Sequence, residues 1–397
     1  MQPLSGLTVV ALEHAIAAPY ATRQLADLGA RVIKVERPGT GDFARGYDAR
    51  VRGLSSHFVW VNRGKESLTL DLKHPAAAAL LERLIIEQAD VVVQNLAPGA
   101  AARLGLSYER LAPARPEIVV CDISGYGASG PYRDKNAYDL LIQAEAGLLS
   151  VTGTPGEPCK AGISIADIAA GVQASQHILV ALLQRARTGR GRHIEISMFE
   201  ALAEWMGFPL YYAIDDAEPP ARGGAAHATI YPYGPFPTGD GASVLLGVQN
   251  EREWRTFCDG VLRRPALADD ARFASNALRH AAREELQPII VAAFAELSAD
   301  EVVARLDAAR IANARVNTMH DVWHHPQLAA RGRWRAVGSQ AGAIPALLPP
   351  GWAGDVDAVD GPRIAPVPAL GQHTDAILGE LGLDAGRIRA LRAAGAV

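Results

Sequence analysis

The sequence predicts an α/β protein, with a large domain built on a parallel sheet that has helices on both faces, and a smaller α+β domain. Three observations lead to this prediction. The chain has 397 residues, of which 49% are hydrophobic and 21% charged, which suits a globular protein of two or three domains. Short apolar runs alternate with helical stretches through about the first 200 residues, a pattern typical of parallel sheets. The composition then changes near residue 217, where a linker rich in Pro and Gly begins.

Six short runs of β-branched and aliphatic residues predict the strands of the large domain. In chain order they are Thr8–Leu12, Arg31–Val35, Leu68–Leu72, Asp90–Gln94, Ile118–Ile123 and His193–Ser197. Helical patterns separate these strands at Pro19–Leu28, Pro75–Gln88, Asp139–Leu149 and Asp167–Arg187. The last helix contains an uncharged run, Ile168–Gln184, whose polar residues favour a buried core helix over a membrane span.

The small domain is expected after the linker Glu218–Gly224. Its predicted elements are a strand at Ser243–Val248 and helices at Glu251–Val261, Arg283–Leu297 and Ala299–Ala309. Residues 335–370 hold six of the 25 prolines, which predicts loops there, because proline cannot continue a helix or a central strand. An amphipathic pattern then predicts one last helix at Thr374–Leu391.

Charge and cysteine content argue against several classes of protein. Lys and Arg number 39 and Asp and Glu 43, a net charge of −4, whereas nucleic-acid-binding domains are usually basic. The three cysteines, Cys121, Cys159 and Cys258, lie far apart without metal-ligand spacing, so we expect no metal and a reducing, cytoplasmic location. The N-terminus has no basic segment followed by a long apolar run, so we expect neither a secretory signal nor a membrane partner.

The sequence also argues against a nicotinamide dinucleotide site. Such a site needs Gly-x-Gly-x-x-Gly after the first strand, where glycine lets the backbone approach the pyrophosphate. The corresponding turn, Glu13–Pro19, contains no glycine. A second candidate, Gly39-Thr-Gly41, has Ala44 where the third glycine would stand. The sheet pattern is therefore present without the fingerprint.

Asp167 is the most informative carboxylate, because it stands where a long apolar helix begins. One interpretation is a helix N-cap, a position at which aspartate is common. The other keeps the same geometry and adds chemistry. The helix dipole would hold the carboxylate ionised at the end of a strand, where it could act as a nucleophile and form a covalent acyl intermediate.

Two further polar residues follow predicted strands, and strand carboxyl ends are where α/β sheets bind ligands. Arg37 ends the run Lys34-Val-Glu-Arg37 and could bind a phosphate with both arms of its guanidinium, or be a solvated surface arginine. Asn95 begins Asn95-Leu-Ala-Pro-Gly99, where it could contact a ligand or simply belong to a turn.

Taken together, segments along nearly the whole chain resemble the family III CoA-transferases, a group that also includes the α-methylacyl-CoA racemases. The order and spacing of these segments carry the resemblance. They are Leu4–Leu12, Ala18-Pro19, Leu25–Arg37, Asn62–Leu72, Asn95–Gly99, Ser124–Pro131, Tyr138-Asp139, Arg187–Gly191, Tyr231–Phe236 and Leu370–Thr374.

The resemblance implies a Rossmann-like large domain made from residues 1–217 and a return segment 326–397, a small domain at 218–325, and an interlocked homodimer. It places the nucleophilic aspartate on Asp167, and it implies acyl-CoA as substrate, with no permanently bound cofactor and no metal. The positions that would contact CoA are His14, Ala15, Ile16, Ala17, Arg37, Leu70, Leu72, Asn95, Leu96, Arg103, Asn136 and Tyr138.

The chain departs from formyl-CoA transferase, a member of that family, at three places. Asn136 stands where that enzyme has a lysine, and Ile16 where it has a glutamine. Lys135 could supply the missing cation, or be a solvated loop lysine. The family member's run of four glycines, which closes over its active site, corresponds here to Phe236–Ser243, for which we expect an ordinary β-hairpin turn instead of a lid.

The resemblance is greatest to enzymes that handle C4 and C5 dicarboxylates, with succinyl-CoA as donor and itaconate, mesaconate or citramalate as acceptor. The cations Arg45, Arg52 and His57 could pair with the distal carboxylate of such an acid, or form a solvated charged loop. Three alternatives stay open: intramolecular C1–C4 transfer in mesaconyl-CoA, a racemase, and a catalytically silent acyl-CoA-binding scaffold. The racemase needs a histidine acid–base group where this chain has Tyr138.

Overall fold

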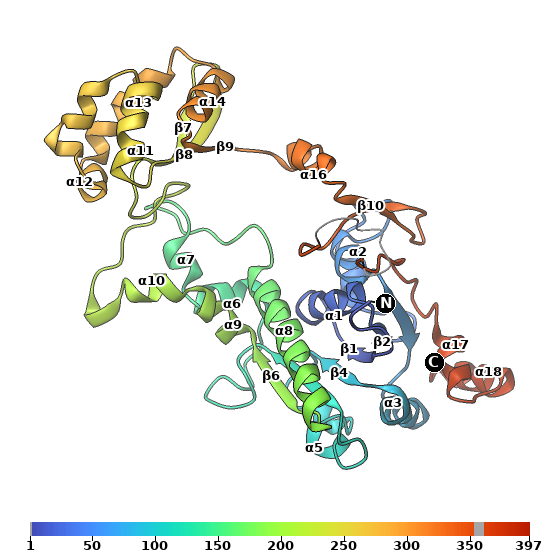
Figure 1. Ribbon diagram of the computed structural model, residues 1–397. Coiled ribbons are helices and arrows are strands. Elements are labelled where there is room, and N and C mark those ends of the chain that lie inside the picture. Colours follow the sequence, from blue (N-terminus) through green and yellow to red (C-terminus); the bar gives the residue numbers. More distant parts are fainter. Residues whose placement is uncertain (1, 353–360) are drawn as a thin grey trace. The chain divides into compact units, whose positions relative to one another are not determined.

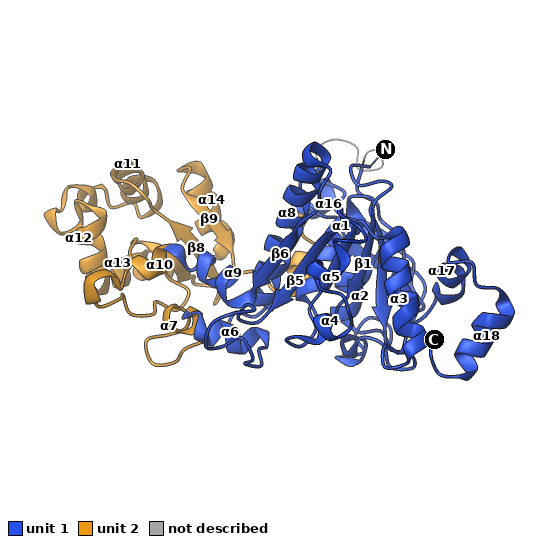
Figure 2. Cartoon of the chain, turned by 90° about the horizontal axis from the view of Figure 1, so that it is seen from below, with its two compact units in different colours: residues 1–147, 161–207, 327–397 blue, residues 148–160, 208–326 orange. Residues whose placement is uncertain are grey.

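The computed structural model describes residues 2–352 and 361–397, and the chain forms two compact units (Figure 2). Unit 1 comprises Met1–Gly147, Ala161–Gly207 and Gln327–Val397, and unit 2 comprises Leu148–Lys160 and Phe208–Pro326. This division differs from the predicted boundaries in two respects. The chain leaves unit 1 at residue 207 instead of 217, and Leu148–Lys160, predicted within the large domain, belongs to unit 2. The return to unit 1 lies within one residue of its predicted position.

Unit 1 is built on a six-stranded sheet of order β3-β2-β1-β4-β5-β6 in which every pair is parallel (Figure 1). This is the strand order of a doubly wound Rossmann-type fold, so the predicted α/β architecture is confirmed. The strands are β1 (Thr8–Leu12), β2 (Arg31–Glu36), β3 (Lys65–Thr69), β4 (Val91–Gln94), β5 (Val119–Ser124) and β6 (His193–Ser197). The third strand begins three residues before its predicted position, because Lys65 and Ser67 lie buried in the sheet beside β2.

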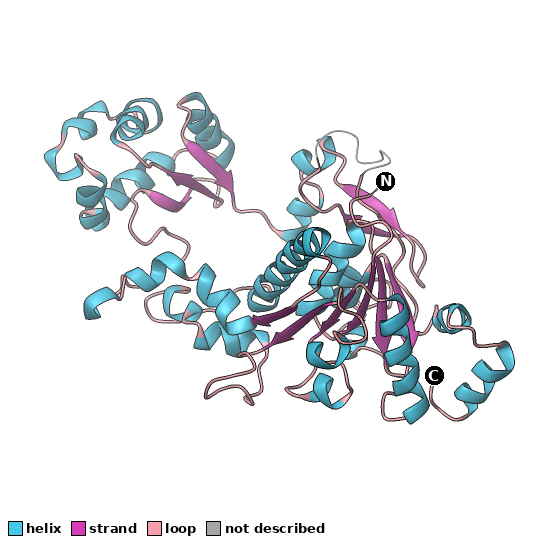
Figure 3. Cartoon of the chain, turned by 60° about the horizontal axis from the view of Figure 1, so that its bottom comes forward, coloured by secondary structure: helices cyan, strands magenta, loops and turns pink. Residues whose placement is uncertain are grey.

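Helices cover both faces of this sheet (Figure 3). Side chains alternate along each strand, so Val9 and Ala11 of β1 enter one core while Val10 and Leu12 enter the other. The first core contains α1 (Ala17–Asp27), α6 (Asp139–Glu145), α8 (Ile165–Thr188) and α9 (Met198–Trp205). The second contains α3 (Pro75–Gln88), α4 (Ala100–Arg103), α5 (Tyr108–Leu111), α17 (Thr374–Glu380) and α18 (Ala385–Ala393).

Helix α8 is long and apolar enough, by length and composition alone, to cross a membrane. Five of its alanines and Ile178 are packed in the first core of unit 1, as predicted for a core helix. Gly171 lets α8 approach α1, because a Cβ atom at this position would stand 2.7 Å from the carbonyl oxygen of Ala17. Asp167 lies one helical turn before Gly171, so this close packing brings it to the N-terminus of α1.

The segment after residue 326 completes unit 1. It contributes α16 (Pro326–Ala330) and the hairpin of β10 (Trp334–Val337) with β11 (Ile344–Leu347), and α17 then packs beside β3. The prediction of a single helix at Thr374–Leu391 is wrong. The chain forms α17 and α18 instead, because Gly382 takes the left-handed φ of +78° between them.

Three smaller elements of unit 1 surround the end of the sheet: the 3₁₀ turn η1 (Phe43–Gly46), α2 (Ser56–Asn62) and the loop before α6. The predicted helix Asp139–Leu149 is divided, because Gly147 at φ +80° separates α6 from α7 (Leu148–Val151).

Unit 2 holds an antiparallel sheet of β7 (Tyr233–Pro237), β8 (Ser243–Gly247) and β9 (Ala312–Arg315), so the α+β prediction is confirmed. The β-hairpin predicted at Phe236–Ser243 is present between β7 and β8. The helices of unit 2 are α7 (Leu148–Val151), α10 (Gly207–Tyr211), α11 (Glu251–Thr256), α12 (Asn276–Ala281), α13 (Arg283–Phe294), α14 (Ala299–Ala308) and α15 (Met319–Trp323), with short helical turns η2 (Ile214–Asp216), η3 (Phe257–Val261), η4 (Pro265–Asp269) and η5 (Ala271–Phe273).

Candidate active site

A pocket of about 370 Å³ opens at the carboxyl ends of strands β1 to β4. This is the edge at which parallel α/β sheets bind ligands. The residues that line it are Leu12, His14, Val35, Glu36, Arg37, Leu70, Asp71, Leu72, Lys73, Leu96, Ala100, Arg103 and Leu104. Six of the predicted CoA-contacting residues are therefore brought together: His14, Arg37, Leu70, Leu72, Leu96 and Arg103.

Three cations stand around the apolar wall of this pocket: Arg37 after β2, Lys73 after β3 and Arg103 on α4. Such a combination of apolar wall and cationic rim can hold an adenine ring and its phosphates. Sequence reasoning missed Lys73. Its position, one residue after Leu72 in the same loop as two other pocket residues, is the signal that could have identified it.

The turn from Glu13 to Ala17 forms one side of the site. Asn95 fixes it from β4: its Oδ1 accepts the His14 N–H at 2.9 Å and its Nδ2 donates to the His14 carbonyl at 2.9 Å. Asn95 was predicted to contact CoA. The structure instead commits its amide to the backbone of the turn, so it orients His14, which lines the pocket.

The far end of the same turn meets Asp167. The Ala17 N–H interacts with the Asp167 carboxylate, at the start of α1. The same turn therefore carries His14, which lines the pocket, and Ala17, whose N–H interacts with Asp167, the predicted nucleophile. The Ala15 N–H is bonded to Asp42 Oδ1 at 3.2 Å, so it is not free to donate to a substrate oxygen.

Asp167 is not the N-cap of α8, so that interpretation is wrong. The cap position is Ser164, and Asp167 is the third helical residue. Capping by a side chain comes instead from Asp139 of α6, whose Oδ1 accepts the N–H of Ala166 at 2.8 Å and of Asp167 at 3.3 Å. The Asp167 carboxylate is thereby free for other chemistry.

The protonation of Asp167 also differs from the prediction that the helix dipole holds it ionised. Burial and, to a smaller extent, the negative charge of Asp139 raise its pKa to about 7, while the Ala17 N–H acts in the opposite direction. Desolvation and a like charge together outweigh the dipole at the helix N-terminus. A perturbed carboxylate of this kind is typical of catalytic sites.

Tyr47 lies near both Asp167 and Tyr138. Burial raises the pKa of Tyr47, and the charges of Asp42, Asp167 and Tyr138 add to the effect. Tyr138 directly precedes α6, and 72% of its surface is exposed. Tyr47 was not identified from the sequence, because nothing in its local pattern distinguishes it from other loop aromatics.

Several predicted CoA contacts lie outside the pocket. Lys135 pairs with Glu145, and its ammonium also lies 4.2 Å from the ring centroid of Tyr132, so it does not supply the missing cation to the pocket. Asn136 and Tyr138 are exposed in the loop before α6. The side chains of Ile16 and Ala17 are buried, so only the backbone of these two residues can face a ligand.

The predicted acceptor cations have other partners. The Arg45 guanidinium forms a bidentate pair with buried Glu36, with both nitrogen–oxygen distances 2.8 Å, and stacks on Phe58. Arg52 donates to the carbonyl of Ala343 at 2.8 Å. The assignment of these two arginines to a substrate carboxylate therefore stays a prediction, and Arg45 is the one whose guanidinium is already paired with a carboxylate of this chain.

His57 is half exposed and differs from the two arginines. Its Nδ1 lies 3.1 Å from Asp48 Oδ2, and its ring packs edge-on against Tyr47. Within residues 2–352 and 361–397, the structure shows no group of three or more His, Cys, Asp or Glu side chains that could hold a metal ion.

Comparison with known proteins agrees with this geometry. The family model described as CoA-transferase family III matches residues 4–374. The chain is 34% identical over 396 residues to the succinate–glutarate CoA-transferase of Agrobacterium fabrum, covering 96% of both chains. It is 37% identical over 334 residues to the acetyl-CoA:oxalate CoA-transferase of Acetobacter aceti, covering 83% of this chain and 84% of the relative.

Among solved structures, a CAIB/BAIF family protein from Brucella suis matches with a TM-score of 0.83 and 34% identity, covering 96% of this chain and 99% of the other. Family and fold agree over nearly the whole length. The chain therefore belongs to the family III CoA-transferases, and it is an enzyme whose substrates are CoA thioesters.

Proposed function

We propose that this enzyme moves CoA from succinyl-CoA to a C4 or C5 dicarboxylic acid, with Asp167 as the nucleophile. One observation carries the proposal: the turn His14–Ala17 has the cation-rimmed pocket at one end and the Asp167 carboxylate at the other. A nucleotide held by Arg37, Lys73 and Arg103 would direct its pantetheine arm along this turn, and its thioester would reach the carboxylate.

In the first half of the reaction, an Asp167 oxygen attacks the thioester carbonyl carbon. The carbon–sulfur bond breaks, which leaves an acyl–aspartyl anhydride and the CoA thiolate. The thiolate then attacks the Asp167 carbonyl of the anhydride. The carbon–oxygen bond breaks, the donor acid leaves as its carboxylate, and Asp167 carries CoA as a thioester.

The second half repeats these steps with the acceptor. Its carboxylate attacks the aspartyl thioester, releasing the thiolate and forming a second anhydride. The thiolate attacks the acceptor carbonyl, which gives the new acyl-CoA and restores the Asp167 carboxylate. One thioester replaces another, so the exchange is balanced without hydrolysis of a nucleoside triphosphate.

The environment of Asp167 suits this role. A pKa near 7 makes the ionised oxygen more basic, and so more nucleophilic, than an ordinary aspartate, while leaving a large ionised fraction at neutral pH. Asp139 contributes the like charge that raises the pKa, and it holds the first turn of α8 at the same time.

The dicarboxylate assignment rests on the relatives. The name of the first relative contains succinate and glutarate, which are C4 and C5 diacids. That of the second contains oxalate, a C2 diacid with acetyl-CoA as donor. We place the distal carboxylate of the acceptor at His57, because His57 is half exposed and contacts Tyr47, which interacts electrostatically with Asp167.

A panel of acids incubated with succinyl-CoA tests the proposal. Glutarate, itaconate, mesaconate and citramalate are expected to accept CoA faster than formate, oxalate or acetate, and Asp167→Ala is the inactive control. Faster turnover of formate or oxalate than of every C5 acid would reject the dicarboxylate assignment. His57→Gln is expected to raise KM for the diacid while leaving KM for succinyl-CoA unchanged.

Three other activities give different results in the same samples. Intramolecular transfer would interconvert the two mesaconyl-CoA isomers without any added acceptor. Racemisation would exchange the α-proton of an acyl-CoA with deuterated solvent while CoA stays in place. A silent binding protein would form no adduct, whereas the proposed mechanism leaves Asp167 as a hydroxamate after hydroxylamine trapping.

We further propose a homodimer in the cytoplasm. Large apolar side chains are exposed on both units of the single chain: Val180 and Leu183 on α8 in unit 1, and Phe208, Leu210 and Tyr211 on α10 in unit 2. Neighbouring exposed apolar side chains of this kind can mark a surface that a partner covers. Analytical ultracentrifugation of the purified chain tests the stoichiometry, and a purely monomeric species at micromolar concentration would reject it.

A further inference from the structure

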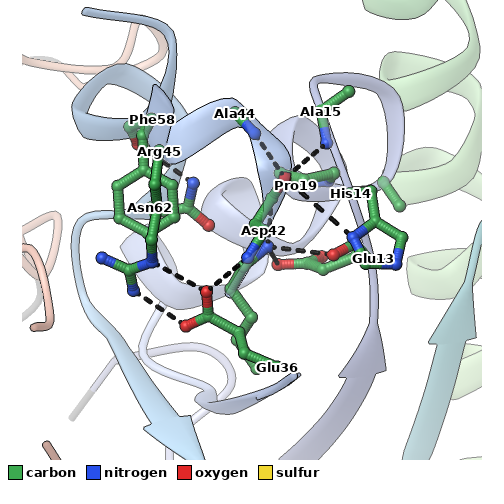
Figure 4. Close-up of polar contacts among 12 residues, drawn as sticks. Glu13, His14, Ala15, Pro19, Glu36, Asp42, Ala44, Arg45, Phe58 and Asn62 are labelled. Atoms are coloured by element: carbon green, nitrogen blue, oxygen red, sulfur yellow. Dashed lines mark hydrogen bonds and ion pairs between the residues drawn. The ribbon is translucent and has the colours of Figure 1, made fainter. Parts of the chain in front are cut away.

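Six ionisable side chains form a cluster at the turn Glu13–Ala17 (Figure 4). They are Glu13, Lys34, Glu36, Asp42, Arg45 and Lys65. All except Arg45 are buried. Three are anions and three are cations, so the cluster carries no net charge when all are ionised. Buried charges are costly unless they are paired and hydrogen-bonded, so the cluster calls for a reason beyond stability.

Asp42 connects this cluster to the active-site turn. It is fully buried, and its Oδ2 lies 2.8 Å from Lys34 Nζ. Its Oδ1 accepts two backbone hydrogen bonds, from Ala15 at 3.2 Å and from Ala44 at 2.9 Å. Every hydrogen-bond distance of this carboxylate thus joins it either to Lys34 or to a backbone N–H.

The Ala15 backbone needs such support. Its φ angle is +58°, in the left-handed region that residues with a Cβ atom disfavour. The hydrogen bond to Asp42 compensates for this strain, and the strained residue turns the chain from β1 into α1. The next two positions are Ile16, which is the cap residue of α1, and Ala17, which packs against Gly171 one turn after Asp167 and whose N–H interacts with the Asp167 carboxylate.

Lys34 holds the other side of the same turn. Its Nζ donates to the Glu13 carbonyl oxygen at 3.2 Å and lies 3.4 Å from Glu13 Oε1. The residues on both sides of His14 are therefore attached, directly or through Asp42, to one lysine of β2. The Nζ of Lys65, in β3, lies 2.6 Å from Glu13 Oε1 and holds this side chain in place.

We propose that Asp42, held by Lys34, is a positioning residue for the CoA transfer: it keeps Ala15 left-handed and so directs the Ala17 N–H at the Asp167 carboxylate. The inference rests on the proposed role of Asp167, and it adds a pair of residues that touch neither substrate nor nucleophile. The strained backbone of Ala15, held by the buried pair of Asp42 and Lys34, thus contributes to the geometry of the active site.

The variant Asp42→Asn tests the proposal. An amide cannot accept from Ala15, accept from Ala44 and face the Lys34 ammonium at once, because one of its two ends is a donor. We expect kcat to fall by about 10- to 100-fold, as is usual when a reacting group is misplaced. KM for succinyl-CoA should change less than kcat, because Arg37, Lys73 and Arg103 are untouched and only His14 of the pocket lies on the loosened turn.

A second readout does not depend on activity. The Ala17 N–H lowers the pKa of Asp167, so a loosened turn should raise that pKa further. Removing the Asp42 charge alone acts in the opposite direction, since a nearby anion raises the pKa of a carboxyl group. Carbon-13 NMR titration of the carboxyl groups, with Asp167→Asn to assign the signal, therefore separates positioning from simple electrostatics. The expected result is an upward shift of about one pH unit.

Asp27→Asn is the matched control. Asp27 is also a buried aspartate, at the other end of α1, where it pairs with Arg63 at 2.7 Å and with Arg23 at 2.9 Å. Losing this pair tests general destabilisation without touching the turn. We expect Asp27→Asn to lower Tm. In the fraction of this variant that is folded, the pH dependence of kcat and the pKa of Asp167 should stay as in the wild type.

A double-mutant cycle keeps the test decisive if Asp42→Asn folds poorly. Lys34→Met with Asp42→Asn removes both charges, so no ion is left without its partner at this pair. If both residues act through the same turn, the loss of kcat in the double variant stays within about threefold of the larger single loss. If the loss of kcat in the double variant equals the product of the two single losses, the proposal is overturned. An unchanged or lowered pKa of Asp167 in Asp42→Asn would also overturn it. A wild-type protein without CoA transfer would instead reject the proposed function, and the NMR result would still stand on its own.

Discussion

Asp139 and Asp167 are joined by a hydrogen bond in which the carboxylate of the first accepts the backbone N–H of the second, at 3.3 Å. The same Oδ1 also accepts the N–H of Ala166. Asp139 therefore stabilises the first turn of α8 and places a negative charge beside the carboxyl group of Asp167. The geometry of the helix and the acidity of the nucleophile are set by one side chain.

Replacing Asp139 by Asn should shift the pH dependence of transfer. Asparagine keeps an acceptor for the two N–H groups, since it is a good capping residue, but it removes the like charge. Ionised Asp167 is then less disfavoured, its pKa falls from about 7, and the acid limb of kcat/KM moves to lower pH by about one unit. A pH–rate profile measures the shift. Asp134→Asn, at an exposed aspartate of the preceding loop, serves as control, and equal profiles for all three proteins would contradict the assignment.

Asp167→Asn should abolish transfer and stabilise the fold in alkaline solution. The folded-state pKa of about 7 lies above the ordinary value, so between about pH 4 and 7 the unfolded chain ionises Asp167 and the folded chain does not. This difference destabilises the wild type fully above pH 7 and vanishes below about pH 4. We expect the variant to gain on the order of 2 kcal/mol in the free energy of unfolding at pH 8. Urea titrations at pH 4 and pH 8 check this, and a gain of equal size at both pH values would indicate another cause.

Gly171→Ala should damage the site through packing. The new Cβ atom would stand 2.7 Å from the Ala17 carbonyl oxygen, so α8 must move away from α1 and carry Asp167 with it. We expect a loss of about 1–3 kcal/mol of stability, typical of overpacking, and a fall in kcat of the order of tenfold. The control is Gly379→Ala in α17, where no atom lies within 4 Å of the added Cβ. That change should leave kcat unaltered and keep or slightly raise Tm, because alanine favours helix.

Neutralising the rim of the pocket should weaken acyl-CoA binding and leave the chemical step intact. Lys73→Gln and Arg103→Gln are each expected to raise KM for succinyl-CoA about tenfold, the usual loss for one charge-assisted contact. Their kcat values should stay within about twofold of the wild type. Steady-state kinetics at two salt concentrations measures both effects. Arg110→Gln, at an exposed arginine of α5, is the charge-matched control, and a rise in its KM equal to that of the pocket variants would refute the site.

The regular part of the fold could be predicted from local pattern. The bounds of β1, α3 and β6 coincide with their predicted ranges, because each has an unbroken apolar period and a clear first residue. Positions decided by long-range contacts could not. The strand β3 begins at Lys65 because its polar residues face buried partners, and a sequence pattern treats buried Lys and Ser as signs of a loop.

The candidate site divides in the same way. Residues one or two positions after strands, such as Arg37 and Leu96, lie at the pocket as predicted, because topology alone brings strand ends together. Arg45 does not, since its partner Glu36 is chosen by the tertiary structure. The raised pKa of Asp167 depends on Asp139, which stands 28 residues earlier in the chain, and no local pattern reveals that pairing.

The discontinuity of unit 1 has a consequence for how the protein is made. On the ribosome, the whole of Phe208–Pro326 is synthesised before the segment Gln327–Val397 that finishes the first unit. Until then β3 lacks the side chains that satisfy its outer edge, because His373 Nδ1 accepts the N–H of Ser67 and Thr374 Oγ1 accepts the N–H of Thr69. In a nascent chain these two N–H groups of β3 therefore lack their acceptors while the second unit is being made.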